Sequence, residues 1–230
     1  MSEYVVFAII VLAGLVQSSL QFGLGGLLML FSNSFGQKTK KKTKKLVNRY
    51  IIGNAFFIMV MTMATAFLIL RSFERLTPAM MAVVVIVLLL SAVGIWTFYY
   101  KTGRSTELWL PKSIRHYIRA RAKETDSRVE AFSLGMLSGF AEMPFSIMLY
   151  IVVANMALEL HHGWQIVGIL VYVIISMAPT LVMKDYIKSG KTLVAVQRWR
   201  IKNKNFIKLM GGIGFVVLAI FVFMFYCLGD

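Results

Sequence analysis

Six long apolar stretches run through this chain of 230 residues and constrain its fold more than any other feature. A helix that crosses the hydrocarbon core of a bilayer, about 30 Å thick, needs roughly 20 apolar residues. The stretches cover residues 4–31, 50–70, 79–100, 131–158, 164–183 and 206–228. With 58% of all residues apolar, the sequence predicts an all-α integral membrane protein with six transmembrane helices, not a soluble domain.

The net charge of +15 follows from membrane topology and does not indicate a nucleic-acid partner. Every Lys and Arg except Arg71 and Arg75 lies in or beside the first, third and fifth connecting segments. Because basic loops stay on the cytoplasmic side, both termini are expected outside. We therefore expect a multi-pass protein of the cell inner (plasma) membrane, whose first helix is retained and not cleaved as a signal peptide.

An internal repeat divides the chain into two halves of three apolar stretches each. Residues 14–28 match residues 135–149, which pairs Gly14 with Gly135, Gln21 with Glu142 and Gly23 with Pro144. A second match pairs Gly53 with Gly168. Because three is odd, the second half enters the membrane with the opposite orientation, as in the inverted repeats of many secondary transporters. The expected division is a first repeat at 1–100, a basic cytoplasmic linker with an interfacial helix at 101–130, and a second repeat at 131–230.

Glu142 stands alone among apolar residues near the centre of the fourth stretch. A carboxylate at that depth costs about 3 kcal/mol on insertion scales, so an acid there predicts a functional site. The predicted substrate-binding or ion-binding set joins Glu142 to polar residues of both repeats, namely Gln21, Ser18, Ser19, Ser138 and Ser146. Burial can bring proton exchange by a carboxyl group into an accessible pH range, which predicts coupling to protons.

Helix breaks are expected beside this site, at Gly23, Gly25, Gly26, Pro144 and Pro179. Glycine tolerates unusual backbone angles, and proline removes one N–H donor from the helix. The alternative interpretation is a glycine-rich face for close helix packing, together with proline kinks that bind nothing.

The three-plus-three pattern, the small-residue motif of residues 21–26 and the proline motif of residues 142–144 resemble the lysine exporter superfamily. Ala178–Pro179 and the segment 197–206 add to the likeness. Relatives of that superfamily include the membrane proteins of cytochrome c biogenesis and the DsbD type, which carry electrons on a cysteine beside each proline. This chain has Phe22–Gly23 and Met143–Pro144 there, so the resemblance implies solute transport without thiol chemistry.

A second resemblance is to sulfite exporters of the TauE/SafE type, whose first helix has Gln followed by Gly-rich sequence, as in residues 16–26. The favoured function is a proton-coupled exporter of a small cation or zwitterion, with the site at the bilayer midplane. The alternatives are a sulfur-oxyanion exporter and a non-transporting assembly or partner subunit. We expect no enzyme activity, no catalytic residue, no resident metal and no cofactor. The partners expected are a small solute, protons and the lipid bilayer, and a homo-oligomer is left open.

Overall fold

The computed structural model describes residues 2–35, 40–98, 120–121, 125–188 and 202–227, and these residues are helical with short turns and no strand. The helices are α1 (Glu3–Phe35), α2 (Lys40–Phe73), α3 (Pro78–Phe98), α5 (Arg128–Glu159), α6 (His162–Lys188) and α8 (Lys204–Val222), which the π-helix η1 (Phe223–Cys227) extends. All six contain a segment long and apolar enough to cross a membrane. The six predicted helices are therefore confirmed, and they fit a multi-pass membrane protein.

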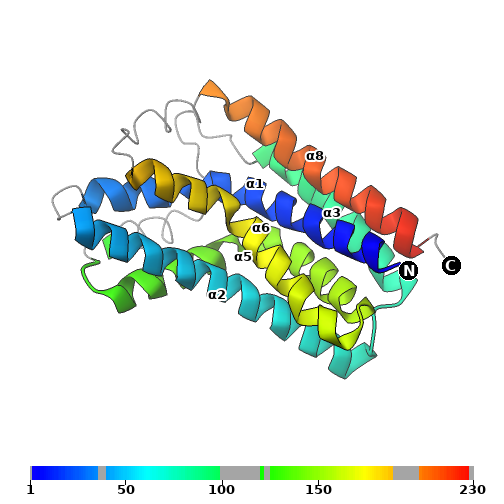
Figure 1. Ribbon diagram of the computed structural model, residues 1–230. Coiled ribbons are helices and arrows are strands. Elements are labelled where there is room, and N and C mark those ends of the chain that lie inside the picture. The colour runs from blue at the N-terminus through cyan, green and yellow to red at the C-terminus, as the bar shows by residue number, and fades with distance from the viewer. Residues whose placement is uncertain (1, 36–39, 99–119, 122–124, 189–201, 228–230) are drawn as a thin grey trace.

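The helices form three principal pairs. α2 packs chiefly against α5, α1 against α6, and α3 against α8, while α1 also contacts α5 and α8. Figure 1 shows α3 and α8 side by side on one flank, with α1 between this pair and the other helices. Both termini lie at the end of the bundle where α2 turns into α3. The centre of the molecule is therefore surrounded by α1, α2, α5 and α6.

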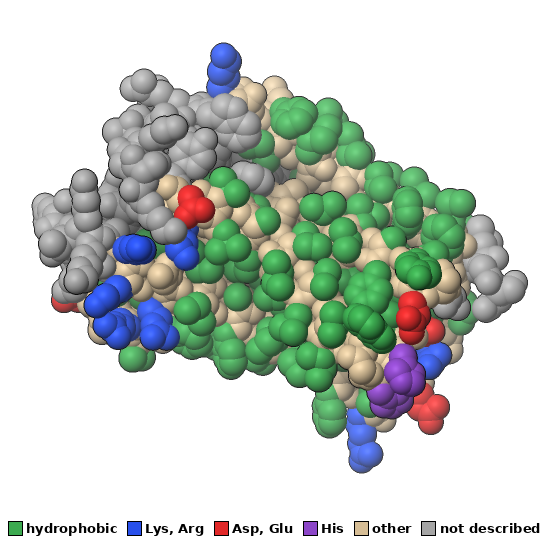
Figure 2. Space-filling view, viewed as in Figure 1, with side chains coloured by type: hydrophobic (Ala, Val, Ile, Leu, Met, Phe, Trp, Pro, Cys, Tyr) green, Lys and Arg blue, Asp and Glu red, His purple; other side chains and the backbone are tan. Residues whose placement is uncertain are grey.

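Apolar side chains cover the outside of the bundle as well as its core. Exposed examples on α3 alone are Val83, Ile86, Leu90 and Val93, each at least half exposed. Figure 2 shows hydrophobic side chains over the middle of the visible face and Lys and Arg gathered toward one end. We call this the basic end, and it contains the starts of α2 and α5. An apolar girdle between polar ends is the surface that a bilayer requires.

The α2–α5 interface is tight because glycine occupies both sides of it. A Cβ atom on Gly53 would overlap the carbonyl of Phe132, and one on Gly135 would overlap the carbonyl of Tyr50. Small residues let membrane helices approach through their backbones, where dispersion and weak contacts accumulate. The two glycines therefore determine how closely α2 and α5 pack.

The turn between α2 and α3 is tied to two other helices at the end opposite the basic end. Glu74 adopts φ = 58°, a left-handed conformation that ends α2. The amide of Leu76 donates to Asn155 Oδ1 in α5 at 3.0 Å, and its carbonyl accepts from the Tyr226 hydroxyl in η1 at 2.6 Å. One backbone residue thus holds α5 and η1 to this turn.

Two expectations of the sequence analysis concern regions that the structure describes only in part. The linker at 101–130 falls largely outside the described residues, and so does the interfacial helix expected there. The side chains at the glycine motif of α1, residues 23–26, are likewise outside the described part.

Candidate functional site

Glu142 lies in the interior of the bundle, on the face of α5 that meets α1. It is 1% exposed, so its side chain does not face lipid. Its Oε2 accepts a hydrogen bond from Gln17 Nε2 of α1 at 3.0 Å. Within the described residues, neither Lys nor Arg pairs with this carboxyl group. The fourth hydrophobic stretch therefore brings an acid to the centre without a counter-cation from its own described chain.

Polar residues recur at four-residue spacing on the buried faces of all four central helices. Because residues four apart share one helix face, each series forms a ladder directed at the same interior. The buried series are Gln17 and Gln21 on α1, Tyr50 and Asn54 on α2, Ser138, Glu142, Ser146 and Tyr150 on α5, and Tyr172, Ser176 and Thr180 on α6. Four helices thus contribute to one buried polar cluster.

Hydrogen bonds join these ladders across the helix interfaces. The Tyr50 hydroxyl donates to Ser138 Oγ at 2.7 Å, which links α2 to α5. The Thr180 hydroxyl donates to Gln21 Oε1 at 2.8 Å, which links α6 to α1. The rings of Tyr150 and Tyr172 meet edge to face, with centroids 6.5 Å apart. Glu142 is close enough to both of these tyrosines to interact with them electrostatically.

Several atoms of the cluster are buried without a hydrogen-bond partner. They are Gln17 Oε1, Gln21 Nε2, Asn54 Oδ1 and Glu142 Oε1, and the hydroxyls of Tyr150 and Tyr172 lie beside Ser146 and Ser176 without a hydrogen bond of good geometry. A buried polar atom without a partner costs about 1–3 kcal/mol, so most such atoms are satisfied in folded proteins. Because these atoms belong to the same ladders as Glu142, the unused hydrogen-bonding capacity is concentrated around this carboxyl group.

The predicted site residues fall into two groups. Gln21, Glu142, Ser138 and Ser146 are buried members of the cluster. The hydroxyls of Ser18 and Ser19 instead donate to the carbonyls of Leu15 and Val16 in α1 itself. Ser19 lies toward Gly211 of α8, on a different side of α1 from Gln17. The structure therefore brings four of the six predicted residues together and leaves the two α1 serines outside.

The helices continue through the positions where breaks were expected. Pro144 lies inside α5 and Pro179 inside α6, and the bounds of α1 include Gly23, Gly25 and Gly26. Figure 1 shows α6 changing direction part-way along its length, and proline is the usual cause of such a kink. The structure thus differs from the expectation of interrupted helices: each proline leaves the helix on both sides of it intact.

Sequence reasoning missed Gln17, Tyr50, Asn54, Tyr172 and Thr180. The signal was present as polar pairs four residues apart within apolar stretches, such as Gln17 with Gln21 and Tyr50 with Asn54. Such a pair marks one helix face, and a polar face inside a membrane is a buried one. Attention to spacing, and not only to charge, would have found these residues.

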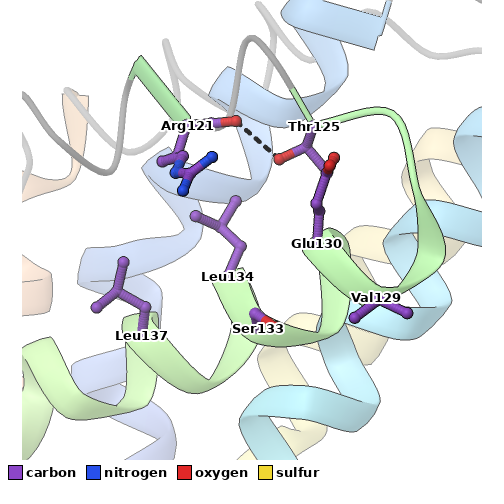
Figure 3. Close-up of a pocket in the computed structure, with 7 residues that line it drawn as sticks. All are labelled: Arg121, Thr125, Val129, Glu130, Ser133, Leu134 and Leu137. Atoms are coloured by element: carbon purple, nitrogen blue, oxygen red, sulfur yellow. Dashed lines mark hydrogen bonds between the residues drawn. The ribbon is translucent and has the colours of Figure 1, made fainter.

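A pocket of about 360 Å³ opens at the basic end, beside the start of α5. Its lining comprises Arg121, Thr125, Val129, Glu130, Ser133, Leu134 and Leu137, which Figure 3 shows. The Thr125 hydroxyl donates to the Arg121 carbonyl at 2.7 Å. Glu142 is five residues beyond Leu137 on the same helix, about 7.5 Å along its axis. Residues five apart also differ by about 140° around the helix, so the pocket and Glu142 lie on different faces of α5.

The described residues offer no metal centre of the usual kind. Among them, no group of three His, Cys, Asp or Glu side chains converges. His161 and His162, at the end opposite the basic end, have ring centroids 6.2 Å apart. The chemistry available at Glu142 is therefore that of one carboxyl group among neutral oxygens and amides.

Comparison with known proteins gives no match to a protein-family model, to a curated protein or to a solved structure. The resemblances to the lysine exporter superfamily and to the TauE/SafE type therefore stay predictions. The functional argument rests on the buried cluster itself.

Proposed function

We propose that this protein is a secondary transporter, a proton-coupled exporter of a small cation or zwitterion, with its site around Glu142 near the bilayer midplane. The single observation that carries the proposal is a carboxyl group 1% exposed, at the centre of four helices, beside polar atoms that lack partners. Helix packing does not need such a group, and an acid within a membrane marks an ion or solute path.

The charge of the site favours a cationic or zwitterionic solute. Ionised Glu142 has one hydrogen-bond donor, Gln17, and no basic partner among the described residues, so a proton or a cationic group can neutralise it. An anion would meet a like charge in a medium of low dielectric constant. A sulfur-oxyanion exporter is therefore less well supported.

The depth of Glu142 argues against a non-transporting partner subunit. In that alternative, a basic group of another protein would pair with this carboxyl group. With Glu142 enclosed by α1, α2, α5 and α6, a partner side chain from outside the bundle would have to pass through a helix interface. A small solute or a proton needs far less space.

Helix packing supports two inverted repeats. In two inverted repeats, α1 corresponds to α5, α2 to α6 and α3 to α8. The α2–α5 pair then corresponds to the α6–α1 pair, and the α3–α8 pair corresponds to itself. The three principal pairs are thus consistent with a pseudo-twofold axis in the membrane plane. The Gln17–Glu142 hydrogen bond joins α1 to α5, which that axis would exchange, so the proposed site lies where the repeats meet.

Glycine contacts support the same relation. Gly14 lies against the Tyr172 carbonyl across the α1–α6 interface, as Gly135 lies against the Tyr50 carbonyl across the α2–α5 interface. Gly14 and Gly135 are equivalent in the sequence repeat, so these contacts make Tyr50 the counterpart of Tyr172. This register is about two helical turns away from the sequence match of Gly53 with Gly168.

Two tyrosines suggest how the site becomes accessible first from one side of the membrane and then from the other. The Tyr50 hydroxyl bonds to Ser138 in the basic half of the bundle, whereas the residues at the two repeat-related positions, Tyr172 and Gln17, are not hydrogen-bonded to each other. In alternating access, inverted repeats exchange their conformations. We infer that Tyr172 bonds to Gln17 in the opposite state, when Tyr50 releases Ser138.

The positive-inside rule makes the basic end cytoplasmic in this proposal, in an inner or plasma membrane. The pocket beside α5 would then be the cytoplasmic entrance, and Leu134 and Leu137 would separate it from Glu142. Loading from the cytoplasm and release outside is the direction expected of an exporter.

Proton flux in proteoliposomes tests the proposal. Purified protein is reconstituted with the pH dye pyranine inside, and gradients of lysine, arginine, Na⁺, K⁺ and, as the anionic arm, sulfite are imposed. We expect one of the cationic or zwitterionic solutes to move protons, and Glu142→Gln to reduce that flux at least about tenfold and to remove its pH dependence. The amide keeps the size of the carboxyl group and cannot exchange a proton in this range.

The matched control is Glu159→Gln at the far end of the same helix, where the carboxylate pairs with exposed Arg75 at 3.3 Å. It makes the same change of charge and is expected to leave flux within about twofold, since a surface ion pair contributes little. Undiminished flux in Glu142→Gln would show the assigned role to be wrong. Flux driven by sulfite alone would favour the oxyanion alternative.

A further inference from the structure

A second pocket, of about 280 Å³, lies at the basic end between the starts of α2 and α5. Its lining consists of Lys45, Asn48, Arg49, Ile52 and Arg128. Three of these residues are cations, two from successive turns of α2 and one from the first turn of α5. Glu142 and the polar cluster do not contribute to this pocket, so it is independent of the proposed transport site.

The three cations are not neutralised within the described residues. Lys45, Arg49 and Arg128 are exposed, and none has an ion pair there. The described acids nearest in sequence to Arg128 are Asp126 and Glu130, and Glu130 caps α5: its Oε2 accepts from the backbone amides of Asp126 and Ser127 at 2.8 and 3.2 Å. Among the described residues, three positive charges around one concavity therefore favour the binding of an anion.

Asn48 adds a requirement beyond charge. Its Oδ1 is a buried acceptor without a partner, at the wall of a pocket otherwise lined by donors and one apolar side chain. A phosphate group has no carbon-bound hydroxyl to offer such an acceptor, whereas a polyol does. A headgroup that carries both a phosphate and a hydroxyl group therefore suits the lining of this pocket.

The lipid-facing surface continues directly from the pocket into the apolar girdle. Ile52 is 49% exposed at the pocket wall, and Phe56, one turn further along α2, is 42% exposed. The Phe56 ring lies 5.7 Å from that of Phe132 in α5, so α2 and α5 share this apolar strip. An acyl chain lying along the strip would bury apolar surface, which a free phosphate would not.

We propose that this pocket binds the headgroup of phosphatidylglycerol from the surrounding membrane. Lys45, Arg49 and Arg128 contact the phosphate, Asn48 accepts from a glycerol hydroxyl, and an acyl chain packs along Ile52 and Phe56. Basic pockets between transmembrane helices at the cytoplasmic side suit anionic headgroups. Arg49 and Arg128 add a forked geometry that matches phosphate oxygens.

Native mass spectrometry of the full-length protein in detergent tests this site by titration with single lipids. Phosphatidylglycerol should bind tightly, and phosphatidylcholine at least about tenfold more weakly. The triple variant Lys45→Gln, Arg49→Gln, Arg128→Gln should lose roughly a hundredfold in affinity, at about fivefold for each basic residue near a membrane surface. The matched control neutralises Lys184, Lys202 and Lys208, which lie near the same end outside the pocket, and should change affinity less than about twofold.

Arg49→Gln alone should weaken phosphatidylglycerol binding about fivefold, which keeps the test valid if the triple variant misfolds. Glycerol 3-phosphate and inorganic phosphate, added without acyl chains, should not compete at matched concentrations. Equal losses in the pocket and control variants would overturn the site, because they would mean diffuse surface charge. Competition by inorganic phosphate would mean a soluble anion site and would overturn the lipid assignment.

Discussion

The α2–α5 and α1–α6 interfaces are built from similar parts and differ in how completely they are closed. In the α2–α5 interface, glycines lie on both sides, the backbones are in contact, and the Tyr50 hydroxyl donates a hydrogen bond to Ser138. In the α1–α6 interface, an added Cβ on Gly14 would lie 3.0 Å from Ile175, and the Tyr172 hydroxyl lies beside Ser176 without a hydrogen bond of good geometry. The backbones of α2 and α5 are therefore in closer contact than those of α1 and α6, and each interface still contains a buried polar atom without a partner, Asn54 Oδ1 in the first and Gln21 Nε2 in the second.

The strongest way to break this comparison is to add a methyl group at equivalent glycines. Gly135→Ala should destabilise the protein by about 3 kcal/mol or more, because its Cβ would overlap the backbone of Tyr50, which cannot rotate away. Gly14→Ala should cost less, about 1 kcal/mol, because its Cβ would lie 3.0 Å from Ile175 Cβ and a shift of a few tenths of an ångström between α1 and α6 relieves the contact. Thermal unfolding in detergent measures both.

The control for this pair is Gly94→Ala in α3, where nothing lies within 4 Å of the added atom. Alanine is the better helix former by up to about 1 kcal/mol, so this variant should be neutral or stabilised. Equal unfolding midpoints for the Gly135 and Gly14 variants would contradict the asymmetry between the interfaces.

Removing one hydroxyl from each tyrosine sharpens the comparison. Tyr50→Phe should cost about 1 kcal/mol, because the hydrogen bond to Ser138 is lost, whereas Tyr172→Phe should leave unfolding almost unchanged. Flux should behave differently, with both variants slowed if each hydroxyl bonds in one of two alternating states. A Tyr172→Phe protein with full flux would remove the exchange mechanism while leaving the role of Glu142 untouched.

The smallest effect expected is at Thr180, whose hydroxyl bonds Gln21 across the α1–α6 interface. Thr180→Val should cost about 1 kcal/mol, because Gln21 Oε1 would lose its donor and, like Gln21 Nε2, become a buried atom without a partner. Thr62→Val is the matched control, since the buried Thr62 hydroxyl bonds only the Ile58 carbonyl of its own helix. Denaturation of the two variants side by side should separate them by several tenths of a kcal/mol, and identical losses would show that the inter-helix bond has no special weight.

Much of the fold could be predicted from hydropathy, because a bilayer leaves a chain few options. Helices satisfy the hydrogen bonds of their own backbone and are therefore the simplest structures that cross a bilayer. The long apolar runs indicated α1, α2, α3, α5, α6 and α8 directly. The position of Glu142 within a long apolar helix was predictable for the same reason, since it depends only on the order of residues along that helix. The ends of the helices were less predictable. α2 begins at Lys40, inside a basic run that hydropathy alone would leave out of the helix.

Which residues meet Glu142 could not be predicted from hydropathy, because that depends on the rotation of each helix about its axis. Ser18 and Gln17 are neighbours in sequence, yet only Gln17 faces α5. The proline expectation was wrong for a related reason: local chemistry indicates a lost hydrogen bond, but the bonds on either side keep α5 and α6 helical. Pairing between helices, and hence the register of the repeats, emerges only from packing.

The anchored turn at Leu76 restricts how such a bundle can move. Its amide bonds to α5 and its carbonyl to η1. These two hydrogen bonds connect the α2–α3 turn, α5 and η1 at the end opposite the basic end. While these two hydrogen bonds hold, rocking of one half against the other has its pivot near Leu76 and its widest displacement at the basic end, so opening at the Leu76 end requires them to break. The bundle would therefore open first at the basic end.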